Sequence, residues 1–394
     1  MDKPIRVLQL FYTFDVEIGG GGLSLFAIEL GKRLNPNKYE VVFCSLGYYE
    51  TSLGKERIIH LNEQGYKAFE ATSWQDAHPY RSFANSFVNL RYKFKSKPFD
   101  IVHSHSEYTD VTAILLKINQ RTKHILRTVH YGFQYEWSTK PLRRAFLTNL
   151  AYPIFFNAEV GINSPITTRL NNRTIARLIK KKAIRIPNAI SFERFSDINV
   201  DPIRKKISLG IPPDAFVVGT IGRLAKQKGY RFLIDAAALI LKEYPNIYFL
   251  IVGDGPLAEE LREQANSLGI GENIIFTGGR TDIEEILPCI DIFASSSLWE
   301  GLPTVLLEAM AAKVVIVATD IPGTNELIKH NVNGWLVDHH DANAIREGIL
   351  HVMNTPHLRI KLVKSAENTL KDYSIDHIAE QYETLYEQIC ENKL

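Results

Sequence analysis

Glu300 and Glu308 stand eight positions apart in a segment that reads as a loop turning into a helix. Gly301 permits a tight turn, and Pro303 suits the first helical position, where a missing N–H costs nothing. The start of such a helix offers free N–H groups and a positive dipole end, which favour a bound phosphate. Two carboxylates beside a phosphate can accept hydrogen bonds from sugar hydroxyls. The alternative is a capped helix that carries two solvated glutamates.

Arg223 and Lys228 follow the strand that the apolar run at residues 216–221 predicts. A guanidinium can bind phosphate oxygens in a bidentate manner, and an ammonium group supplies a point charge. Ligands of α/β folds bind at the carboxyl ends of strands, so this position favours a phosphate site over two solvated surface cations.

Four consecutive glycines, residues 19–22, lie between a first strand and a helix, where bare backbone can approach a ligand closely. A mobile loop tip is the alternative, since the spacing does not match GxGxxG. His130 stands just past another strand, and its side chain can hydrogen-bond a hydroxyl and titrates in a useful range. His103 and His105 read as buried structural residues. The chain contains no Asp-x-Asp pair and no cysteine or histidine spacing typical of a metal site.

Short apolar strands alternate with helices, which predicts an α/β chain with parallel, doubly wound sheets. This alternation of strands and helices extends through the first half of the chain and continues in the second half. A proline-containing stretch between residues 187 and 213 separates the two parts. We therefore expect two domains, residues 1–190 and 191–374, joined by a linker. Strand ends of both domains would face a cleft. The last 20 residues form an amphipathic helix pattern. The predicted strands are at residues 5–10, 39–44, 100–103, 124–129, 216–221, 247–252, 274–276, 291–294 and 314–318.

The charge of the chain is unevenly distributed. Residues 1–190 contain 27 Lys and Arg against 15 Asp and Glu, whereas residues 191–394 contain 19 against 29, so the halves carry +12 and −10. This asymmetry predicts that one domain meets an anionic partner. The three cysteines are far apart, which favours a reducing compartment. The N-terminus does not read as a signal peptide, and no apolar run is long enough to span a membrane.

Taken together, these motifs resemble those of the retaining GT-B glycosyltransferases of family 4, also called glycosyl transferases group 1. The matching residues, in order along the chain, are Gly19 to Gly22, His130, Gly222-Arg223-Leu224, Lys228-Gly229, Gly253-Asp254-Gly255-Pro256, Glu300 and Glu308. The resemblance implies two Rossmann-like domains with a nucleotide-sugar between them, and a C-terminal helix at residues 375–394 that returns to the N-terminal domain. It also implies a metal-independent enzyme without a cofactor. Tyr131 and the run from Asn188 to Ser191 depart from the family pattern.

The resemblance assigns a role to each motif. Arg223 and Lys228 would bind the donor diphosphate together with the backbone of the glycine loop and of the helix start, namely Gly20, Gly21, Gly22, Thr304 and Val305. Glu308 would bind the ribose, and Gly253 and Gly255 would line the nucleotide pocket. Glu300 and His130 would be the catalytic residues. Glu300, with the backbone N–H groups near residues 303–305, would hold the sugar and phosphate, and His130 would meet the transferred sugar or the acceptor. The donor would be a UDP-, GDP- or ADP-sugar.

The basic first half alternates cations with aromatic residues, for example at residues 91–97, and this composition suits peripheral docking on an anionic membrane. Solvated helix faces are the alternative. No nucleic-acid-binding motif accompanies the charge. We therefore expect a cytoplasmic enzyme, peripheral on the inner face of the membrane, that builds a glycolipid, polysaccharide or glycan precursor on a hydroxyl of a lipid-linked acceptor. A soluble transferase that makes a small sugar conjugate or disaccharide, and a non-catalytic nucleotide-sugar-binding protein, are the competing interpretations.

Overall fold

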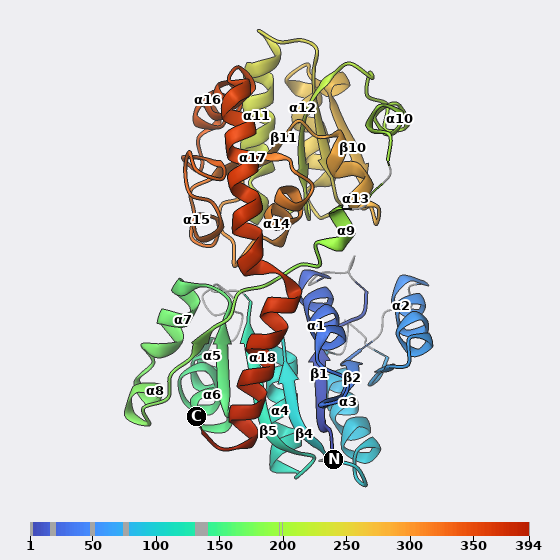
Figure 1. Cartoon of the computed structure of the whole chain (residues 1–394), viewed down its shortest axis with the longest axis vertical. Helices are drawn as coiled ribbons and strands as arrows, with labels where there is room; N and C mark the ends of the chain where they lie inside the picture. Colours follow the sequence, from blue (N-terminus) through green and yellow to red (C-terminus); the bar gives the residue numbers. More distant parts are fainter. Residues whose placement is uncertain are drawn as a thin grey trace. The chain divides into compact units, whose positions relative to one another are not determined.

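The computed structural model describes residues 3–15, 21–47, 52–73, 79–130, 141–196, 198 and 200–393. The chain forms two compact units (Figure 1). Unit 1 comprises Met1–Ala189 and Ile375–Leu394, and unit 2 comprises Ile190–Ser374. The boundary expected after residue 190 lies one residue from this division.

Unit 1 is built on a seven-stranded sheet with the strand order β3-β2-β1-β4-β5-β6-β7. Every pairing between neighbouring strands is parallel. The order reverses between β1 and β4, which makes this position the topological switch point of the sheet. The strands are β1 (Ile5–Phe11), β2 (Tyr39–Ser45), β3 (Lys67–Glu70), β4 (Phe99–Ser104), β5 (Thr122–Val129), β6 (Ala158–Gly161) and β7 (Ile184–Arg185).

Helices cover both faces of this sheet, and successive residues of β1 show why. Val7 belongs to a core with α1 and α18, whereas Leu8 and Leu10 belong to a second core with α3, α4 and α6. Side chains alternate between the faces of a strand, so a strand buried on both faces is apolar throughout. The helices of unit 1 are α1 (Gly21–Arg33), α2 (Ser52–Glu63), α3 (Pro79–Lys93), α4 (Glu107–Ile118), α5 (Pro141–Phe146), the π-helix η1 (Leu147–Ala151), α6 (Tyr152–Phe155), α7 (Ser164–Asn171), α8 (Thr174–Leu178) and α18 (Ile375–Cys390).

Unit 2 repeats the plan with a six-stranded parallel sheet in the order β10-β9-β8-β11-β12-β13. Its switch point lies between β8 and β11. The strands are β8 (Phe216–Ile221), β9 (Ile247–Val252), β10 (Ile274–Gly278), β11 (Ile292–Ser295), β12 (Val315–Thr319) and β13 (Trp335–Val337). The helical elements are α9 (Glu193–Ser196), α10 (Pro202–Ser208), η2 (Lys226–Lys228), α11 (Tyr230–Leu241), α12 (Ala258–Ser267), η3 (Gly271–Asn273), α13 (Ile283–Ile286), η4 (Leu287–Cys289), α14 (Thr304–Ala311), α15 (Thr324–Leu327), α16 (Ala342–Met353), α17 (Pro356–Leu370) and η5 (Lys371–Tyr373).

The prediction of two α/β, Rossmann-like domains is confirmed, and α18 belongs to the N-terminal unit as expected. The cleft between the domains stays a prediction. One local detail was wrong: Pro303 is the N-cap of α14 and not its first helical residue. Among the described residues, no helix is both long and apolar enough to cross a membrane.

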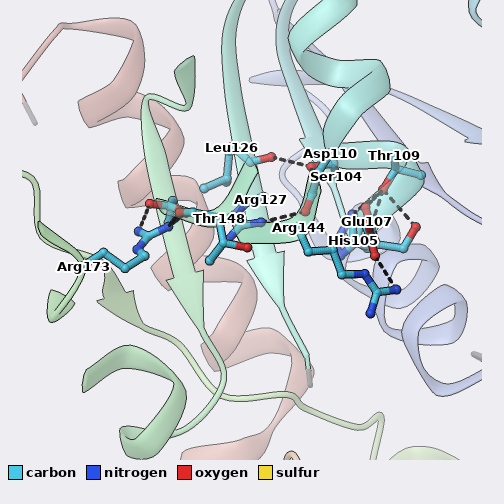
Figure 2. A network of polar contacts seen from close by, with 12 residues as sticks. Ser104, His105, Glu107, Thr109, Asp110, Leu126, Arg127, Arg144, Thr148 and Arg173 are labelled. Atoms are coloured by element: carbon cyan, nitrogen blue, oxygen red, sulfur yellow. Dashed lines mark hydrogen bonds and ion pairs between the residues drawn. The ribbon is translucent and has the colours of Figure 1, made fainter. Parts of the chain in front are cut away.

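A buried chain of ion pairs crosses the sheet of unit 1 (Figure 2). The guanidinium of Arg127 on β5 lies 2.8 Å from a carboxylate oxygen of Asp110 and 2.8 Å from one of Glu159, and its side chain is fully buried. Glu159 also pairs with Arg173. Burial alone would raise the pKa of Glu159, but the charges of Arg127 and Arg173 outweigh it and hold this pKa below the ordinary value. The chain of charges therefore joins α4, β5, β6 and the segment before α8.

Candidate functional site

Two loops meet at the switch point of unit 2. Residues 222–229 follow β8, and residues 296–301 follow β11, its neighbour in the sheet. The backbone N–H of Leu298 donates to the carbonyl of Gln227 at 2.8 Å, and the Gln227 amide donates to the carbonyl of Trp299 at 3.0 Å. The Ser296 hydroxyl donates to the carbonyl of Lys228 at 2.9 Å. These bonds hold the two predicted motifs side by side.

The side chains of Lys228 and Glu300 form an ion pair across these loops, with 2.6 Å between Nζ and Oε1. The lysine side chain is 20% exposed and the glutamate side chain 6%. Glu300 also accepts hydrogen bonds from Ser297 Oγ at 2.8 Å and from Gln227 Nε2 at 3.2 Å. The carboxylate is thus nearly buried, satisfied by three donors and tied to the cation expected to bind phosphate.

Arg223 is the other predicted phosphate ligand. Its side chain is exposed, and no hydrogen bond or ion pair holds it among the described residues. It therefore remains available for an anion, whereas Lys228 is already engaged. The backbone N–H groups of Thr304 and Val305 lie in the first turn of α14, where no carbonyl of the same helix can accept from them.

Glu308 lies five residues into α14 and is partly exposed. Its pKa is raised above the ordinary carboxylate value, chiefly by burial and further by the charge of Glu284, while Arg194 and Lys228 act in the opposite direction. Arg194 and Glu284 pair with each other at 2.9 Å. Among the residues that the structure describes, no cation forms an ion pair with Glu308, so its oxygens can accept from ligand hydroxyls.

Glycines shape this site by close backbone packing. A Cβ at Gly253 would lie 2.0 Å from the carbonyl oxygen of Gly222, and the φ of Gly253 is +141°. A Cβ at Gly255 would lie 2.5 Å from the carbonyl oxygen of Leu224. Both glycines therefore hold the loop after β9 against the loop that carries Arg223. Their role as the wall of a nucleotide pocket stays a prediction.

Sequence reasoning missed three residues of this site. Gln227 and Ser297 bind Glu300, although neither polar side chain stands out in the sequence. Tyr230 is buried, and this burial raises the pKa of its hydroxyl to about 12. By geometry the hydroxyl has no hydrogen-bond partner among the described residues. This hydroxyl lies 3.1 Å from the point where a Cβ of Gly222 would be, on the side that carries the Lys228 chain. Its position directly after the Lys-Gly pair was the available signal.

The histidines of unit 1 form a separate cluster at the ends of β4 and β5. His103, His105 and His130 are all buried, and the Nδ1 of His105 lies 3.3 Å from the Nε2 of His130. Burial lowers the pKa of His130 to about 3, so the ring is neutral. Phe26, one turn into α1, packs against the His130 ring at 5.5 Å between centroids.

The glycine loop leads into α1. Gly21 is the first residue of this helix, and a Cβ at Gly22 would meet nothing within 4 Å. Gly19 and Gly20 lie outside the described residues, as does Tyr131. That Gly20, Gly21, Gly22 and His130 share a site with Lys228 stays a prediction.

Comparison with known proteins covers both units. A family model described as "Glycosyl transferases group 1" matches residues 202–369, and one described as "Glycosyltransferase Family 4" matches residues 20–158. An Escherichia coli UDP-Gal:alpha-D-GlcNAc-diphosphoundecaprenol alpha-1,3-galactosyltransferase is 29% identical over 78% of this chain and 80% of its own length. A Campylobacter jejuni alpha-1,4-N-acetyl-D-galactosaminyltransferase, named for an acceptor linked to PP-undecaprenol, is 28% identical over 79% of this chain and 81% of its own.

Solved structures show the same architecture. Anabaena HepE, in complex with UDP and glucose, superposes with a TM-score of 0.77 over 97% of this chain and 99% of its own, at 20% identity. Sucrose-phosphate synthase from Thermosynechococcus elongatus superposes with a TM-score of 0.79 over 98% of this chain and 99% of its own, at 17% identity. At these identities the likeness establishes the GT-B fold alone. Because both halves match models of these transferases and relatives over about four fifths of the chain are glycosyltransferases, the protein belongs to the family 4 glycosyltransferases.

Proposed function

We propose that this glycosyltransferase moves a sugar from a nucleoside diphosphate donor to a hydroxyl of a lipid-linked saccharide, with retention of configuration and without a metal ion. The observation that carries the proposal is the Lys228–Glu300 pair at the switch point of unit 2, beside the exposed Arg223 and the start of α14. This arrangement sets cations and N–H groups where a leaving diphosphate would develop charge, which stabilises the transition state electrostatically.

The proposed roles follow from the chemistry of each group. Arg223, Lys228 and the N–H groups of Thr304 and Val305 bind the diphosphate oxygens, and Glu308 accepts from the ribose hydroxyls. Glu300 accepts from hydroxyls of the transferred sugar once Lys228 turns to the phosphate. The bond from the sugar C1 to the diphosphate breaks, and the acceptor oxygen forms the new bond on the same face. The acceptor proton passes to the leaving phosphate oxygen, so no enzyme base is needed, and attack by the acceptor on the same face needs no enzyme nucleophile.

The names of the relatives guide the choice of donor and acceptor. The Escherichia coli relative is named for a UDP-sugar, and both relatives are named for saccharides on an undecaprenyl diphosphate. We therefore propose a UDP-sugar as the donor to test first, with GDP- and ADP-sugars as comparisons, and a diphosphoundecaprenol-linked saccharide as the acceptor.

Transfer assays test this proposal directly. Purified protein is incubated with UDP-, GDP- and ADP-sugars and a polyprenyl-diphosphate saccharide, in parallel with EDTA and with Mg²⁺. We expect transfer from one donor, unchanged by EDTA, and a product with the anomeric configuration of the donor by NMR. Transfer that needs Mg²⁺ would refute metal independence, and an inverted product would refute retention. Activity only on water-soluble sugars would favour the small-conjugate interpretation, and donor binding without turnover on any acceptor would favour a binding protein.

We also propose that unit 1 docks on an anionic membrane surface. Leu142, Phe146, Leu150 and Ile154 are all exposed and stand four residues apart along the continuous helix of α5, η1 and α6. Leu178 at the end of α8, which contacts η1 and α6, is 71% exposed. The exposed cations Arg177, Lys180 and Lys182 surround it in sequence. An apolar stripe beside cations is typical of a helix at the interface of an anionic bilayer.

Liposome flotation tests the docking surface. The wild-type chain should float with vesicles that contain phosphatidylglycerol and should remain in solution with neutral vesicles. The double variant L142S/F146S should lose flotation, whereas I360S, which removes a similarly exposed apolar side chain from unit 2, should float as the wild type does. Equal recovery in solution with both vesicle types, or flotation of L142S/F146S at the wild-type level, would overturn this part of the proposal.

A further inference from the structure

His130 stands at one end of a chain of buried hydrogen bonds that reaches the C-terminal helix. His105 Nδ1 lies 3.3 Å from His130 Nε2, and His105 Nε2 lies 2.9 Å from the Oε1 of Gln9 on β1. Gln9 Nε2 donates to the hydroxyl of Tyr386 on α18 at 3.1 Å. We call these three residues, Gln9, His105 and Tyr386, the relay. All of them are at most 2% exposed, so no bulk water competes for these bonds.

The amide of Gln9 gives the relay a direction. Its oxygen can only accept, so the Nε2 of His105 must carry the proton and donate to it. A neutral imidazole has one N–H, so the Nδ1 of His105 carries a lone pair. The Nε2 of His130 must then donate to it, which leaves the Nδ1 of His130 as an acceptor.

The protonation states of the three imidazole rings support this order of donors and acceptors. Burial lowers the pKa of His103, His105 and His130 well below the ordinary value, so each ring is neutral. At its far end the relay is anchored by His103, whose Nδ1 lies 2.8 Å from the Tyr386 hydroxyl and whose Nε2 lies 2.8 Å from the Thr128 hydroxyl. The Tyr386 hydroxyl accepts from Gln9 and so can donate to His103.

The Nδ1 of His130 is the ring atom at the open end of this hydrogen-bonded chain. His130 is 4% exposed, and its Nδ1 has no hydrogen-bond partner by geometry among the described residues. The direction of the relay rests on the Gln9 amide, whose oxygen faces His105 and whose nitrogen faces Tyr386. Asn188 lies close enough to favour a proton on the His130 ring. Because its carboxamide can present either oxygen or nitrogen, Asn188 does not set the direction.

We propose that Gln9, His105 and Tyr386 are positioning residues that hold His130 in the Nε2–H tautomer, so that its Nδ1 accepts a hydrogen bond from a hydroxyl of the sugar or the acceptor. The inference rests on the proposed function for the identity of that hydroxyl, but the tautomer itself does not depend on it. Helix α18, through Tyr386, thereby helps to determine which ring nitrogen of His130 can accept a hydrogen bond.

NMR of the full chain labelled with ¹⁵N-histidine tests the tautomer without any substrate. Long-range ¹⁵N–¹H correlations distinguish a ring protonated at Nε2 from one protonated at Nδ1. We expect wild-type His130 to be the Nε2–H form. In Gln9→Met and Tyr386→Phe the direction is no longer imposed, so the Nδ1–H form should rise to a share comparable with the other. Tyr39→Phe is the control, because it removes another buried hydroxyl that contacts α18, bonded to the carbonyl of Glu383 and outside the relay.

A wild-type His130 protonated at Nδ1 would overturn the proposal, and so would wild-type tautomer populations in both relay variants. Kinetics then test the role in transfer. Across the variants, kcat should fall in proportion to the population of the Nδ1–H form, while the KM for the donor stays at its wild-type value. Loss of kcat without a tautomer change would show a merely structural role. If the wild-type chain transfers no sugar, the proposed function fails, and the NMR result still decides whether the relay sets the tautomer.

Discussion

Neutralising Glu300 should strengthen the binding of a nucleoside diphosphate, even though it weakens transfer. The Lys228 ammonium lies 2.6 Å from the Glu300 carboxylate, so a diphosphate must compete with this carboxylate for the cation. Glu300→Gln keeps the size of the side chain and an oxygen that can accept from Lys228 and Ser297. It removes the charge that holds the lysine.

The exposures of the two side chains set the size of the effect. Exposed ion pairs contribute about 0.2–1 kcal/mol, whereas breaking a buried pair costs about 3–5 kcal/mol. The lysine is 20% exposed and the glutamate 6%, and two further donors share the carboxylate. We therefore place the competing interaction at about 1–2 kcal/mol, which corresponds to a Kd for UDP that is about 5- to 30-fold lower in the variant.

Isothermal titration calorimetry with UDP measures this change, and transfer assays measure the accompanying loss of kcat. Glu243→Gln is the matched control, because it neutralises another carboxylate of unit 2, one that pairs with Arg346 on the surface. This control has the same change in net charge and should bind UDP with wild-type affinity. Wild-type or weaker affinity in Glu300→Gln would refute the idea that the carboxylate restrains Lys228.

Three further outcomes follow from the structure. Arg127→Met leaves Asp110 buried without its cation and should lower the free energy of unfolding by about 3–5 kcal/mol, as measured by urea denaturation; a loss below about 1 kcal/mol would contradict this reading of the network. Gly253→Ala places a Cβ 2.0 Å from the carbonyl oxygen of Gly222 at a positive φ, so it should lower the melting temperature and weaken UDP binding, and wild-type values for both would count against the packing argument. Because the pKa of Glu308 is raised in the folded chain, its contribution to stability is present below the ordinary carboxylate pKa and is lost as the pH rises through the raised value. Glu308→Gln should therefore gain stability relative to wild type over that window in denaturation curves, and a constant difference across pH would exclude the raised pKa.

The strands that sequence patterning found are those with clear apolar runs of their own. The run Phe216–Ile221 was expected as a strand and is one, with the bounds that its apolar residues predict. The short strands β3, β6, β7 and β13 were missed. β3, for example, has only four residues, two of them charged, so its local signal is weak. Its pairing with β2 comes from the neighbouring strand and not from its own composition.

In the candidate site, too, some features could be predicted from the sequence and others could not. Sequence alone placed Arg223 and Lys228 after one strand and Glu300 after another, because glycine, proline and apolar periodicity mark where strands end. The ion pair between Lys228 and Glu300 could not be predicted, since the two residues lie 72 positions apart and meet only because β8 and β11 are neighbours. His105 was interpreted as a structural histidine, and the structure makes it the link between His130 and Gln9.

The amino-acid sequence by itself determined the two Rossmann-like sheets, the strand ends that carry polar residues and the family to which the motifs belong. These features depend on turn chemistry and on the period of apolar residues, which act over a few positions of the chain. Only the tertiary structure decided which polar groups share a proton or a charge. Gln9 and Tyr386 are separated by 377 positions, and their hydrogen bond exists because α18 packs on the face of the sheet that β1 presents to it. Contacts of this kind depend on distances between packed elements, and no local pattern in the chain records them.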